Sequence, residues 1–416
     1  STPQAGIKQT NFWEVLLMKA SLKTIAAASL VALGLGAASF AQAGHHEVKI
    51  GVILGFTGPI ESLTPDMAAS AELAMKEVSD SGMLLDGKKI VAVRADSTCI
   101  DAAAATAAAE RLISSEGVAA IYGADCSGVT TAIANNVAVP NGVVMVSPSA
   151  TSPALSTIDD NGYFFRTAPS DARQGEVLAS ILKSRGINNV AVTYTNNDYG
   201  KGLASSFADA FDGKIEISAA HEDGKGDYSA EVGALSASGS EHLVVFGYLD
   251  QGGKGIIQTS LDTGAFSNFI LADGMIGQAL VDSIGEGLTG AIGTVPGSES
   301  AGAKQFLEYA SAHGIDGDGP FRAESYDAAA LLALAMQASG STDRAGIQSK
   351  VMDVANAPGE KIYPGELGKA LKILADGGQV NYEGATNVEF SAVGEAFGSY
   401  KELEVKNGKF TTVAVH

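Results

Sequence analysis

From residue 47 onward, short apolar segments typical of buried strands alternate with longer amphipathic segments, and this alternation limits the possible folds strongly. EVKIGVILGF predicts a strand, and TPDMAASAELAMKEVSDSG after it predicts a helix that ends at a glycine. Similar strand and helix pairs continue as far as VVMVSP, which ends at residue 148. Repeated units of this kind indicate an α/β fold with a mostly parallel sheet covered by helices on both faces.

The pattern is interrupted and then starts again, which predicts a second lobe of the same kind. YFFRTAPSD is an extended, proline-containing connection, and DARQGEVLASILKSRG begins a second series of helices and strands. IGTVPGS near residue 292 predicts another extended crossing, and helical patterns then cover 301–313, 325–338 and 343–355. The final YKELEVKNGKFTTVAV predicts a hairpin with an Asn-Gly turn. We therefore expect two doubly wound, Rossmann-like lobes with a ligand cleft beyond the carboxyl ends of their strands.

Charge and composition exclude two classes of protein. The chain has 416 residues and a formal net charge of −20, which argues against a nucleic-acid partner because phosphate binding needs clustered Lys and Arg. Hydrophobic residues make up 46% of the chain, enough for packed cores and too many for a disordered protein.

The amino-terminal segment resembles an export signal. Met18, Lys19 and Lys23 provide a positive region, TIAAASLVALGLG is apolar, and AQA at 41–43 fits a cleavage site. The alternative, a membrane anchor, needs a longer apolar stretch than this one. We expect residues 1–43 to be a leader and signal peptide cleaved near Ala43, and the remaining protein to be periplasmic.

The chain contains two cysteines, Cys99 and Cys126. In an oxidising, exported compartment an even pair favours a disulfide, and the alternative is two buried free thiols. Two cysteines without nearby histidines do not make a zinc site.

Motifs for catalysis or cofactor binding are not convincing anywhere in the sequence. A G-x-S-x-G serine elbow is missing, and GFTGPI stands where a dinucleotide-binding G-x-G-x-x-G would follow the first strand. GMLLDGKK approaches a phosphate-binding loop, but Lys89 replaces the required Ser or Thr. We therefore expect no catalytic residues, no cofactor and no metal, and a plain turn at GMLLDGKK.

Polar residues instead gather in loops that follow predicted strands. CSGV places Ser127 at the N-cap of a helix, and SPSATSP presents further hydroxyls at a second helix entry. Helix N-termini carry unpaired N–H donors and partial positive charge, so two of them facing one cleft would bind an anion. The candidate residues in these loops are Ser127, Ser149, Thr151, Tyr199, Tyr248 and Asp273. Ordinary capping, lobe packing and turn formation are the alternative roles for them.

Taken together, these segments resemble the type I periplasmic solute-binding proteins of ABC importers, in the branched-chain amino-acid (Leu/Ile/Val-binding) group. The resemblance runs from about residue 47 to the carboxyl end. The segments that carry it are KIGVILGFTGP, DSTC…GADCSG, VSPSATSP, FRTAPSD, NDYGKGL, DYSAEV and ESYDAAALL.

The resemblance implies two lobes, three hinge strands, a closing cleft and a disulfide between Cys99 and Cys126. On the expected boundaries, lobe 1 comprises 44–165 and 298–385, and lobe 2 comprises 166–297 and 386–416.

The resemblance also implies roles for the candidate residues. The ligand carboxylate would lie on Ser127, Ser149 and Thr151, with Ala150 in the same loop. Tyr199, Tyr248 and Asp273 would meet the ammonium group and the body of the ligand.

Two departures put an aliphatic ligand in doubt. Asp273 stands where the family often has Glu, and Glu61 lies in a loop where relatives carry small or aromatic residues. Glu61 could contact a polar ligand tail or lie in solvent.

We therefore expect a binding protein that delivers an amino acid, branched-chain or polar, to ABC permease and ATPase subunits in the inner membrane. The alternatives are a binding protein for another small carboxylate or amide, and a ligand sensor for a membrane receptor.

Overall fold

The first lobe is built around a five-stranded sheet of order β2-β1-β3-β4-β5. The structure is a computed structural model that describes residues 46–416. β1 pairs parallel with β3, β3 with β4, and β4 with β5, as the repeated strand–helix pattern predicts. The elements are β1 (Glu47–Leu54), α2 (Thr64–Ser81), β2 (Lys89–Asp96), α3 (Ala102–Ser114), β3 (Ala120–Gly123), α4 (Ser127–Ile133), β4 (Met145–Ser147) and β5 (Phe164–Arg166).

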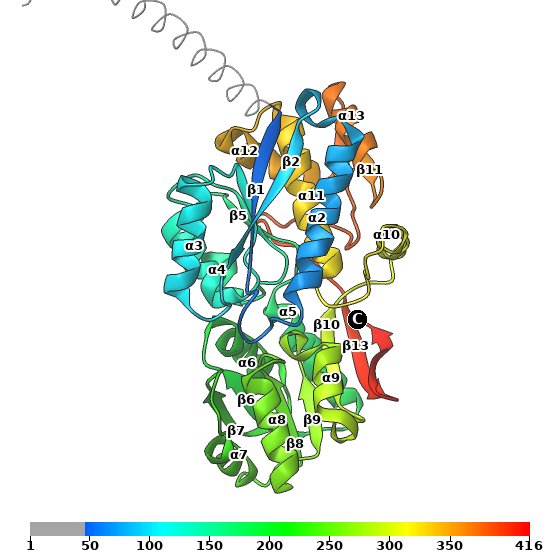
Figure 1. The fold of residues 1–416 in the computed structure, drawn as a ribbon. Coiled ribbons are helices and arrows are strands. Elements are labelled where there is room, and N and C mark those ends of the chain that lie inside the picture. Colours follow the sequence, from blue (N-terminus) through cyan, green and yellow to red (C-terminus); the bar gives the residue numbers. More distant parts are fainter. Residues whose placement is uncertain (1–45) are drawn as a thin grey trace, which may run out of the picture. The chain divides into compact units, whose positions relative to one another are not determined.

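The second lobe contains a seven-stranded sheet of order β14-β13-β10-β9-β8-β6-β7. β6 to β10 pair parallel, whereas β13 pairs antiparallel with β10 and with β14. Its elements are α5 (Asp171–Ser184), β6 (Asn189–Thr195), α6 (Asp198–Ala210), β7 (Lys214–His221), α7 (Ser229–Ser236), β8 (His242–Phe246), α8 (Gly252–Thr263), β9 (Asn268–Leu271), α9 (Gln278–Ile284), β10 (Ile292–Pro296), β13 (Tyr400–Lys406) and β14 (Lys409–Val415). Figure 1 shows the two sheets one above the other, with helices beside each.

The predicted carboxyl-terminal hairpin is confirmed. β13 and β14 are joined at Asn407 and Gly408, whose φ angles of 51° and 71° are those of a tight hairpin turn. The predicted helices after β10 are also present, as α10 (Ala301–Ala312), α11 (Arg322–Ser339) and α12 (Arg344–Ala355).

Shorter elements that the sequence pattern did not predict complete the two lobes and their loops. They are helix α13 (Leu367–Ala375), the paired strands β11 (Glu360–Ile362) and β12 (Val380–Tyr382), the π-helical η2 (Ala134–Ala138), and the 3-10 turns η1 (Leu84–Asp86), η3 (Pro153–Thr157), η4 (Asp273–Met275) and η5 (Gly285–Leu288). SPSATSP therefore leads into the single 3-10 turn η3, not into the α-helix that we expected.

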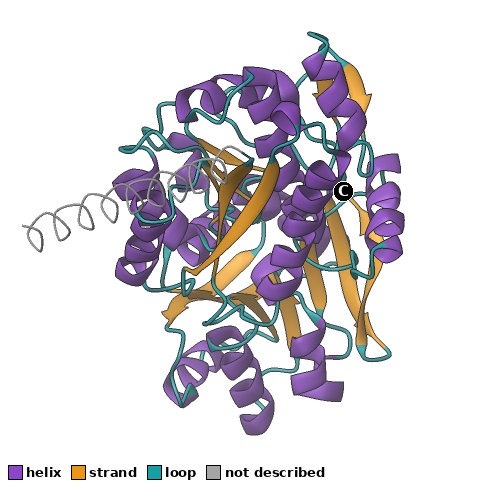
Figure 2. Cartoon of the chain, turned by 45° about the horizontal axis from the view of Figure 1, so that its top comes forward, coloured by secondary structure: helices purple, strands orange, loops and turns teal. Residues whose placement is uncertain are grey.

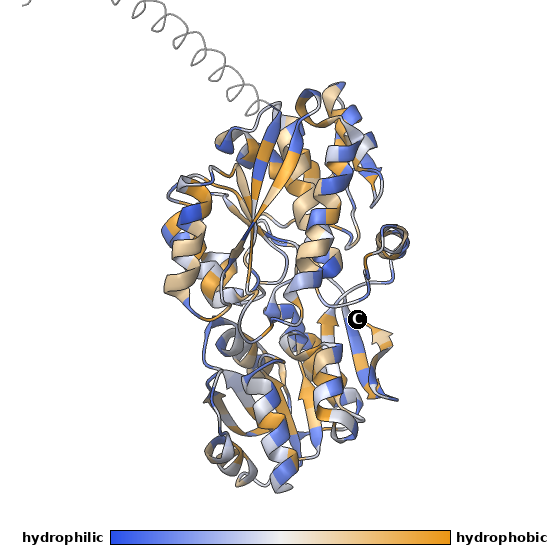
Figure 3. Ribbon diagram, viewed as in Figure 1, coloured by the Kyte–Doolittle hydropathy of each residue, from blue (hydrophilic) through white to orange (hydrophobic). Residues whose placement is uncertain are grey.

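The cores lie between the sheets and their helices, as expected for strands covered on both faces. In β1, Ile50, Val52, Ile53 and Leu54 are fully buried, and α11 packs along α2 on one side of the first sheet. Figure 2 shows helices on both sides of the strands. In Figure 3, strands such as β9 are hydrophobic along their length, whereas helices such as α2 carry both hydrophobic and hydrophilic residues.

Within residues 46–416 the chain passes between the two sheets in three segments, after β5, after β10 and before β13. These segments contact one another. The N–H of Ala396 donates to the carbonyl of Arg166 at 3.1 Å, and the N–H of Gly297 donates to the carbonyl of Ser399 at 3.0 Å. The arrangement is a three-strand connection of the kind that permits hinge motion. The exact lobe boundaries stay a prediction.

Across residues 46–416, none of the helices has the length and apolarity that crossing a membrane requires. The predicted signal peptide lies outside the described residues.

Candidate ligand-binding cleft

A cavity of about 20 Å³ lies where loops of the two lobes meet. Every loop that contributes to it follows the carboxyl end of a strand, apart from the one at Phe321, so the cavity occupies the place where α/β sheets bind ligands. Tyr199, Tyr248 and Asp273 line it from the second lobe and are buried. Because these side chains are closed off from solvent, the lobes must separate for a ligand to reach them.

Ser127 lines the cavity from the first lobe, but it is not an N-cap as we predicted. Cys126 holds the N-cap position with an extended backbone, and Ser127 is the first residue of α4. The cap lies one residue earlier because Cys126 is fixed by its disulfide to Cys99 and by its N–H, which donates to Oδ1 of Asp125 at 2.9 Å. The Ser127 hydroxyl instead accepts the N–H of Ser152 at 3.1 Å.

Of the predicted residues in SPSATSP, Ser149 lines the cavity, and its hydroxyl donates to the carbonyl of Asp125 at 3.0 Å. Ala150 is buried behind the wall, and its N–H donates to the hydroxyl of Ser147 at 2.9 Å. Thr151 is also fully buried behind the wall, where its hydroxyl lies near the carboxyl of Asp171 without a well-formed hydrogen bond. The loop therefore presents fewer free donors to the cavity than its composition suggests.

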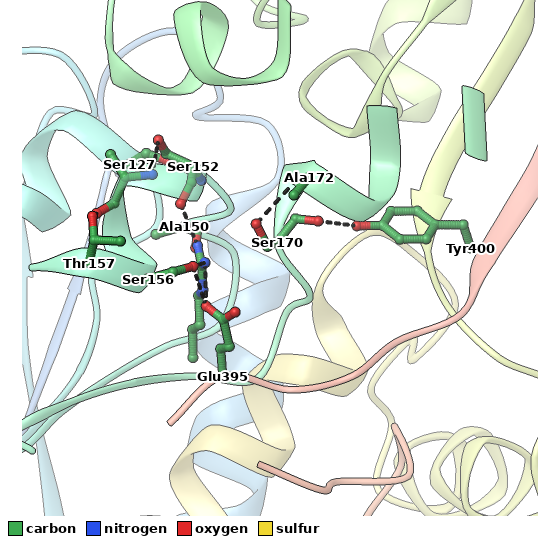
Figure 4. A network of polar contacts seen from close by, with 11 residues as sticks. Ser127, Ala150, Ser152, Ser156, Thr157, Ser170, Ala172, Glu395 and Tyr400 are labelled. Atoms are coloured by element: carbon green, nitrogen blue, oxygen red, sulfur yellow. Dashed lines mark hydrogen bonds and ion pairs between the residues drawn. The ribbon is translucent and has the colours of Figure 1, made fainter. Parts of the chain in front are cut away.

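Arg166, which the sequence analysis did not single out, holds this loop from behind. Its side chain is 1% exposed, and Nη1 donates to the carbonyls of Ala150 at 3.0 Å and Ser152 at 2.8 Å. Nη2 donates to the Ser156 hydroxyl at 2.8 Å and to Oε2 of Glu395 at 2.6 Å. Figure 4 shows Ala150, Ser152, Ser156 and Glu395 gathered around one point. The paired guanidinium thus turns two carbonyls of the loop away from the cavity.

Asp273 is held in place by a tyrosine of the same lobe. The hydroxyl of Tyr199, in the first turn of α6, donates to Oδ1 of Asp273 at 2.7 Å and accepts the N–H of Gly274 at 3.1 Å. The ring of Tyr199 stacks on Tyr248 with centroids 5.2 Å apart. Burial raises the pKa of Asp273, while the bonds from Tyr199 and Gly274 lower it.

Asp171 is a second buried acid that the sequence analysis missed. It is the first residue of α5, and both of its carboxyl oxygens are buried without a well-formed hydrogen bond to the rest of residues 46–416. Burial raises its pKa well above the usual range, and the negative charge of Asp273 raises it further. The sequence predicted a helix beginning at this residue, but an acid in the first turn of a helix is common and did not mark Asp171 as a site residue.

The remaining wall is apolar. Ile60 and Leu63, from the loop after β1, face the cavity together with Phe321. Phe321 has a left-handed backbone with φ of 60° at the N-cap of α11, a strained conformation for a bulky residue and one that is typical of functional sites.

Glu61 lies on the other side of its loop, at the surface. It is exposed, its Oε2 accepts the N–H of Gly58 at 3.2 Å, and it does not line the cavity. The structure therefore favours the solvent-exposed role for Glu61 over contact with a ligand.

Sequence comparison matches the chain to a known protein family. A family model described as periplasmic binding protein matches residues 47–368. Leu/Ile/Val-binding protein homolog 3 of Brucella melitensis biotype 1 is 29% identical over 323 residues, which cover 75% of this chain and 85% of that relative.

Solved structures share the fold. A leucine binding protein of Thermotoga maritima matches with a TM-score of 0.72 at 26% identity, over 88% of this chain and 98% of that one. A solute binding protein of an ABC transporter from R. palustris, solved in complex with 4-hydroxybenzoate, matches with a TM-score of 0.71 at 18% identity, over 89% and 97% of the two chains. At 18% identity the likeness shows the fold alone.

Proposed function

Because this chain belongs to the periplasmic binding protein family, we propose that it captures an α-amino acid between its two lobes as the substrate-binding component of an ABC importer. The observation that carries this proposal is the pair of buried acids, Asp171 and Asp273. Asp273 lines the cavity and its charge raises the pKa of Asp171, and two buried carboxyls coupled in this way favour a nearby cation such as a ligand ammonium.

The ligand carboxylate would lie on the opposite wall. Ser127 and Ser149 bring hydroxyl groups to the first-lobe side of the cavity, and the buried Arg166 adds positive charge behind that wall. An anion there and an ammonium at Asp273 would match the two ends of a zwitterion.

The side chain of the ligand would meet Ile60, Leu63 and Phe321, which favour an aliphatic group over a polar one. The relative from Brucella is named for binding leucine, isoleucine and valine, and it supports the same choice. We therefore propose a branched-chain amino acid, and Glu61 does not take part.

A thermal-shift and calorimetric screen tests the proposal. L-leucine, L-isoleucine and L-valine should bind and raise the melting temperature by mass action. The deaminated analogue of leucine, 4-methylpentanoate, should bind at least about tenfold more weakly, because it leaves the two acids without a cation. Equal affinity for leucine and 4-methylpentanoate would show that the acids do not hold an ammonium.

A plain aromatic carboxylate is the second candidate, because a protein of the same fold was solved with 4-hydroxybenzoate. That ligand carries no cation for Asp171 and Asp273, so the buried acids count against it. Adding benzoate and 4-hydroxybenzoate to the screen decides between the two ligand classes.

The importer role and the cellular location form the last part of the proposal. We propose that the signal peptide is cleaved near Ala43 and that the exported protein, which is a binding protein and not an enzyme, delivers its ligand to permease and ATPase subunits. Uptake of labelled leucine should fall when the gene is deleted and return when it is restored. Unchanged uptake, with loss of a behavioural response to leucine, would indicate a sensor for a membrane receptor.

A further inference from the structure

Two contacts join the lobes at the rim of the cleft, outside the cavity, and each depends on one residue of the second lobe. We propose that Asp250 and Gly202 are positioning residues that set how readily the cleft closes, and so control ligand affinity without touching the ligand. The inference rests on the proposed function in one respect, since it takes the ligand to bind between the lobes.

The first rim contact is a pair of hydrogen bonds made by Asp250. Its Oδ2 accepts the N–H of Ser62 at 2.8 Å, and its own N–H donates to the carbonyl of Pro59 at 3.0 Å. Pro59 and Ser62 belong to the loop after β1 in the first lobe, whereas Asp250 follows β8 in the second. None of the three lines the cavity, so both bonds can form only when the lobes come together.

An apolar contact lies beside these bonds. A methyl group at Gly277, just before α9, would lie 2.8 Å from Cδ1 of Leu249 and 3.1 Å from Cδ2 of Leu63. Leu249 precedes Asp250 and Leu63 follows Ser62, so the hydrogen-bonded rim continues into tightly packed side chains from both lobes. Ser62 is exposed and Asp250 is half-buried, so their hydrogen bond lies at the surface end of this packing.

The second rim contact is made by Gly202, inside helix α6 of the second lobe. A methyl group at this position would lie 2.8 Å from Cδ of Pro153 and 3.1 Å from Oγ of Ser152. Pro153 begins the 3-10 turn η3 in the first lobe, and a proline ring cannot swing aside as a flexible side chain can. The atoms nearest to such a methyl all belong to the first lobe.

The close contact that favours glycine at position 202 is therefore a contact between the lobes. Glycine is disfavoured relative to alanine in a helix interior, because it loses more backbone freedom on folding. Its benefit arises only in the closed form, where it lets α6 approach η3. An alanine at this position should stabilise the second lobe and at the same time hold the lobes apart.

The opposite effects of this alanine on stability and on cleft closure can be measured. Ligand affinity depends on the closing equilibrium, because a ligand held by both lobes binds the closed form more tightly. Gly202→Ala should leave the melting temperature of the ligand-free protein unchanged or raise it, and should weaken L-leucine binding by roughly tenfold. A residue with a merely structural role would move stability and affinity in the same direction.

Gly233 provides a matched control. It lies inside helix α7 of the same lobe, it is exposed, and a methyl group there would meet no atom of residues 46–416 within 4 Å. Gly233→Ala should stabilise its helix without changing the affinity for L-leucine.

Asp250 is tested by a pair of substitutions. Asp250→Ala removes the acceptor for the Ser62 N–H and should weaken L-leucine binding by about twofold to tenfold. Asp250→Asn keeps an oxygen in the same place and should restore most of the affinity. Equal losses in both variants, or none in either, would overturn the role of Asp250.

A measurement without ligand separates this inference from the proposed function. Ser62→Cys and Asp250→Cys together form a reporter pair, and the native cysteines are already bonded to each other. The rate at which the reporter pair oxidises in ligand-free protein follows the population of closed molecules. Adding Gly202→Ala should slow this reaction severalfold, whereas adding Gly233→Ala should not.

The affinity measurement and the cross-linking measurement distinguish a wrong ligand from a wrong rim inference. If wild-type protein does not bind L-leucine but Gly202→Ala slows the cross-link, the proposed ligand is wrong and the rim contacts stand. If L-leucine binds wild type and Gly202→Ala equally tightly and the cross-link forms at the same rate, the proposed ligand stands and the rim inference is wrong.

Discussion

Tyr199 fixes the carboxyl group of Asp273 through a 2.7 Å hydrogen bond, and the same hydroxyl accepts the N–H of Gly274 at 3.1 Å. The acid that we propose as an ammonium partner is therefore oriented by its own lobe. Such preorganisation lowers the entropy that binding would otherwise lose. The short side chain of Asp273 relies on Tyr199 for its placement.

Removing the charge of either buried acid should weaken amino-acid binding. Asp273→Asn and Asp171→Asn keep the shape of the side chain, and each should lower the affinity for L-leucine about tenfold or more, since a charge-assisted bond is lost. Asp209→Asn, at an exposed position in α6, is the control. Calorimetry should show that neither acid variant loses affinity for 4-methylpentanoate. Full leucine affinity in both acid variants would refute the assignment.

Tyr199→Phe should weaken binding less than Asp273→Asn does. The substitution keeps the ring that stacks on Tyr248 but removes the bond to Asp273, so the carboxylate remains charged and loses its orientation. We expect a loss of about threefold to tenfold in L-leucine affinity, measured by calorimetry. A loss larger than that of Asp273→Asn would mean that Tyr199 contacts the ligand directly.

The buried acid Glu324 should make stability depend on pH between about 4.5 and 8. It is 4% exposed beside the crossings at Thr167 and Pro296, and burial raises its pKa to about 8, with Asp327 raising it and Lys401 lowering it. The folded protein thus holds a proton that the unfolded chain releases near pH 4.5. Its contribution to stability is complete below that pH and is lost as the pH rises through about 8.

Thermal unfolding between pH 6 and pH 9 checks this expectation. The melting temperature should fall across this range, and Glu324→Gln should flatten the decline because the amide stays neutral. A decline of equal steepness in Glu324→Gln would assign the pH dependence to other groups.

The ion pair of Arg166 and Glu395 should matter for both stability and binding. Arg166→Lys keeps a positive charge but cannot bond both loop carbonyls and Glu395 in the same geometry, so the loop should lose its fixed shape. Truncating one partner of a buried pair costs about 3–5 kcal/mol, and Arg166→Ala should approach that value. Denaturant unfolding measures the loss. Glu395→Gln should cost less, since Glu395 is 22% exposed and the amide can still accept a bond.

The disulfide should stabilise the fold and support the cavity wall. Its cysteines are 27 residues apart, and a loop of that size corresponds to about 3–4 kcal/mol of stabilisation in the chain-entropy model. Cys99→Ala with Cys126→Ala should lower the free energy of unfolding by a similar amount and weaken ligand binding, because Cys126 precedes Ser127. Unchanged L-leucine affinity in the double variant would show that α4 is placed without the bond.

The two-lobed architecture could be predicted because it depends on patterns repeated many times. Strands such as Glu47–Leu54 and the Asn407–Gly408 hairpin carry local signals that tertiary contacts did not override. Tyr199, Tyr248 and Asp273 could be picked out because each directly follows or begins an element at a strand end.

Residues that act through contacts distant in sequence were harder to predict. Arg166 bonds to Glu395, 229 positions away, and such pairing leaves no local pattern. Asp171 was missed as a site residue, although its helix was predicted to begin there, because an acid in the first turn of a helix is common. The N-cap at Ser127 was wrong by one residue because a disulfide, and not the capping preference of serine, fixes the start of α4.

The place of β13 and β14 in the second sheet has a consequence for biosynthesis. The first sheet uses no strand beyond Arg166, but β10 receives its antiparallel neighbour roughly a hundred residues after its own end, when Tyr400–Lys406 is made. Until the final hairpin emerges, the nascent second lobe presents an open strand edge on which another chain could pair. Once made, residues 400–416 cover this edge of β10, and β14 becomes the outer strand of the sheet.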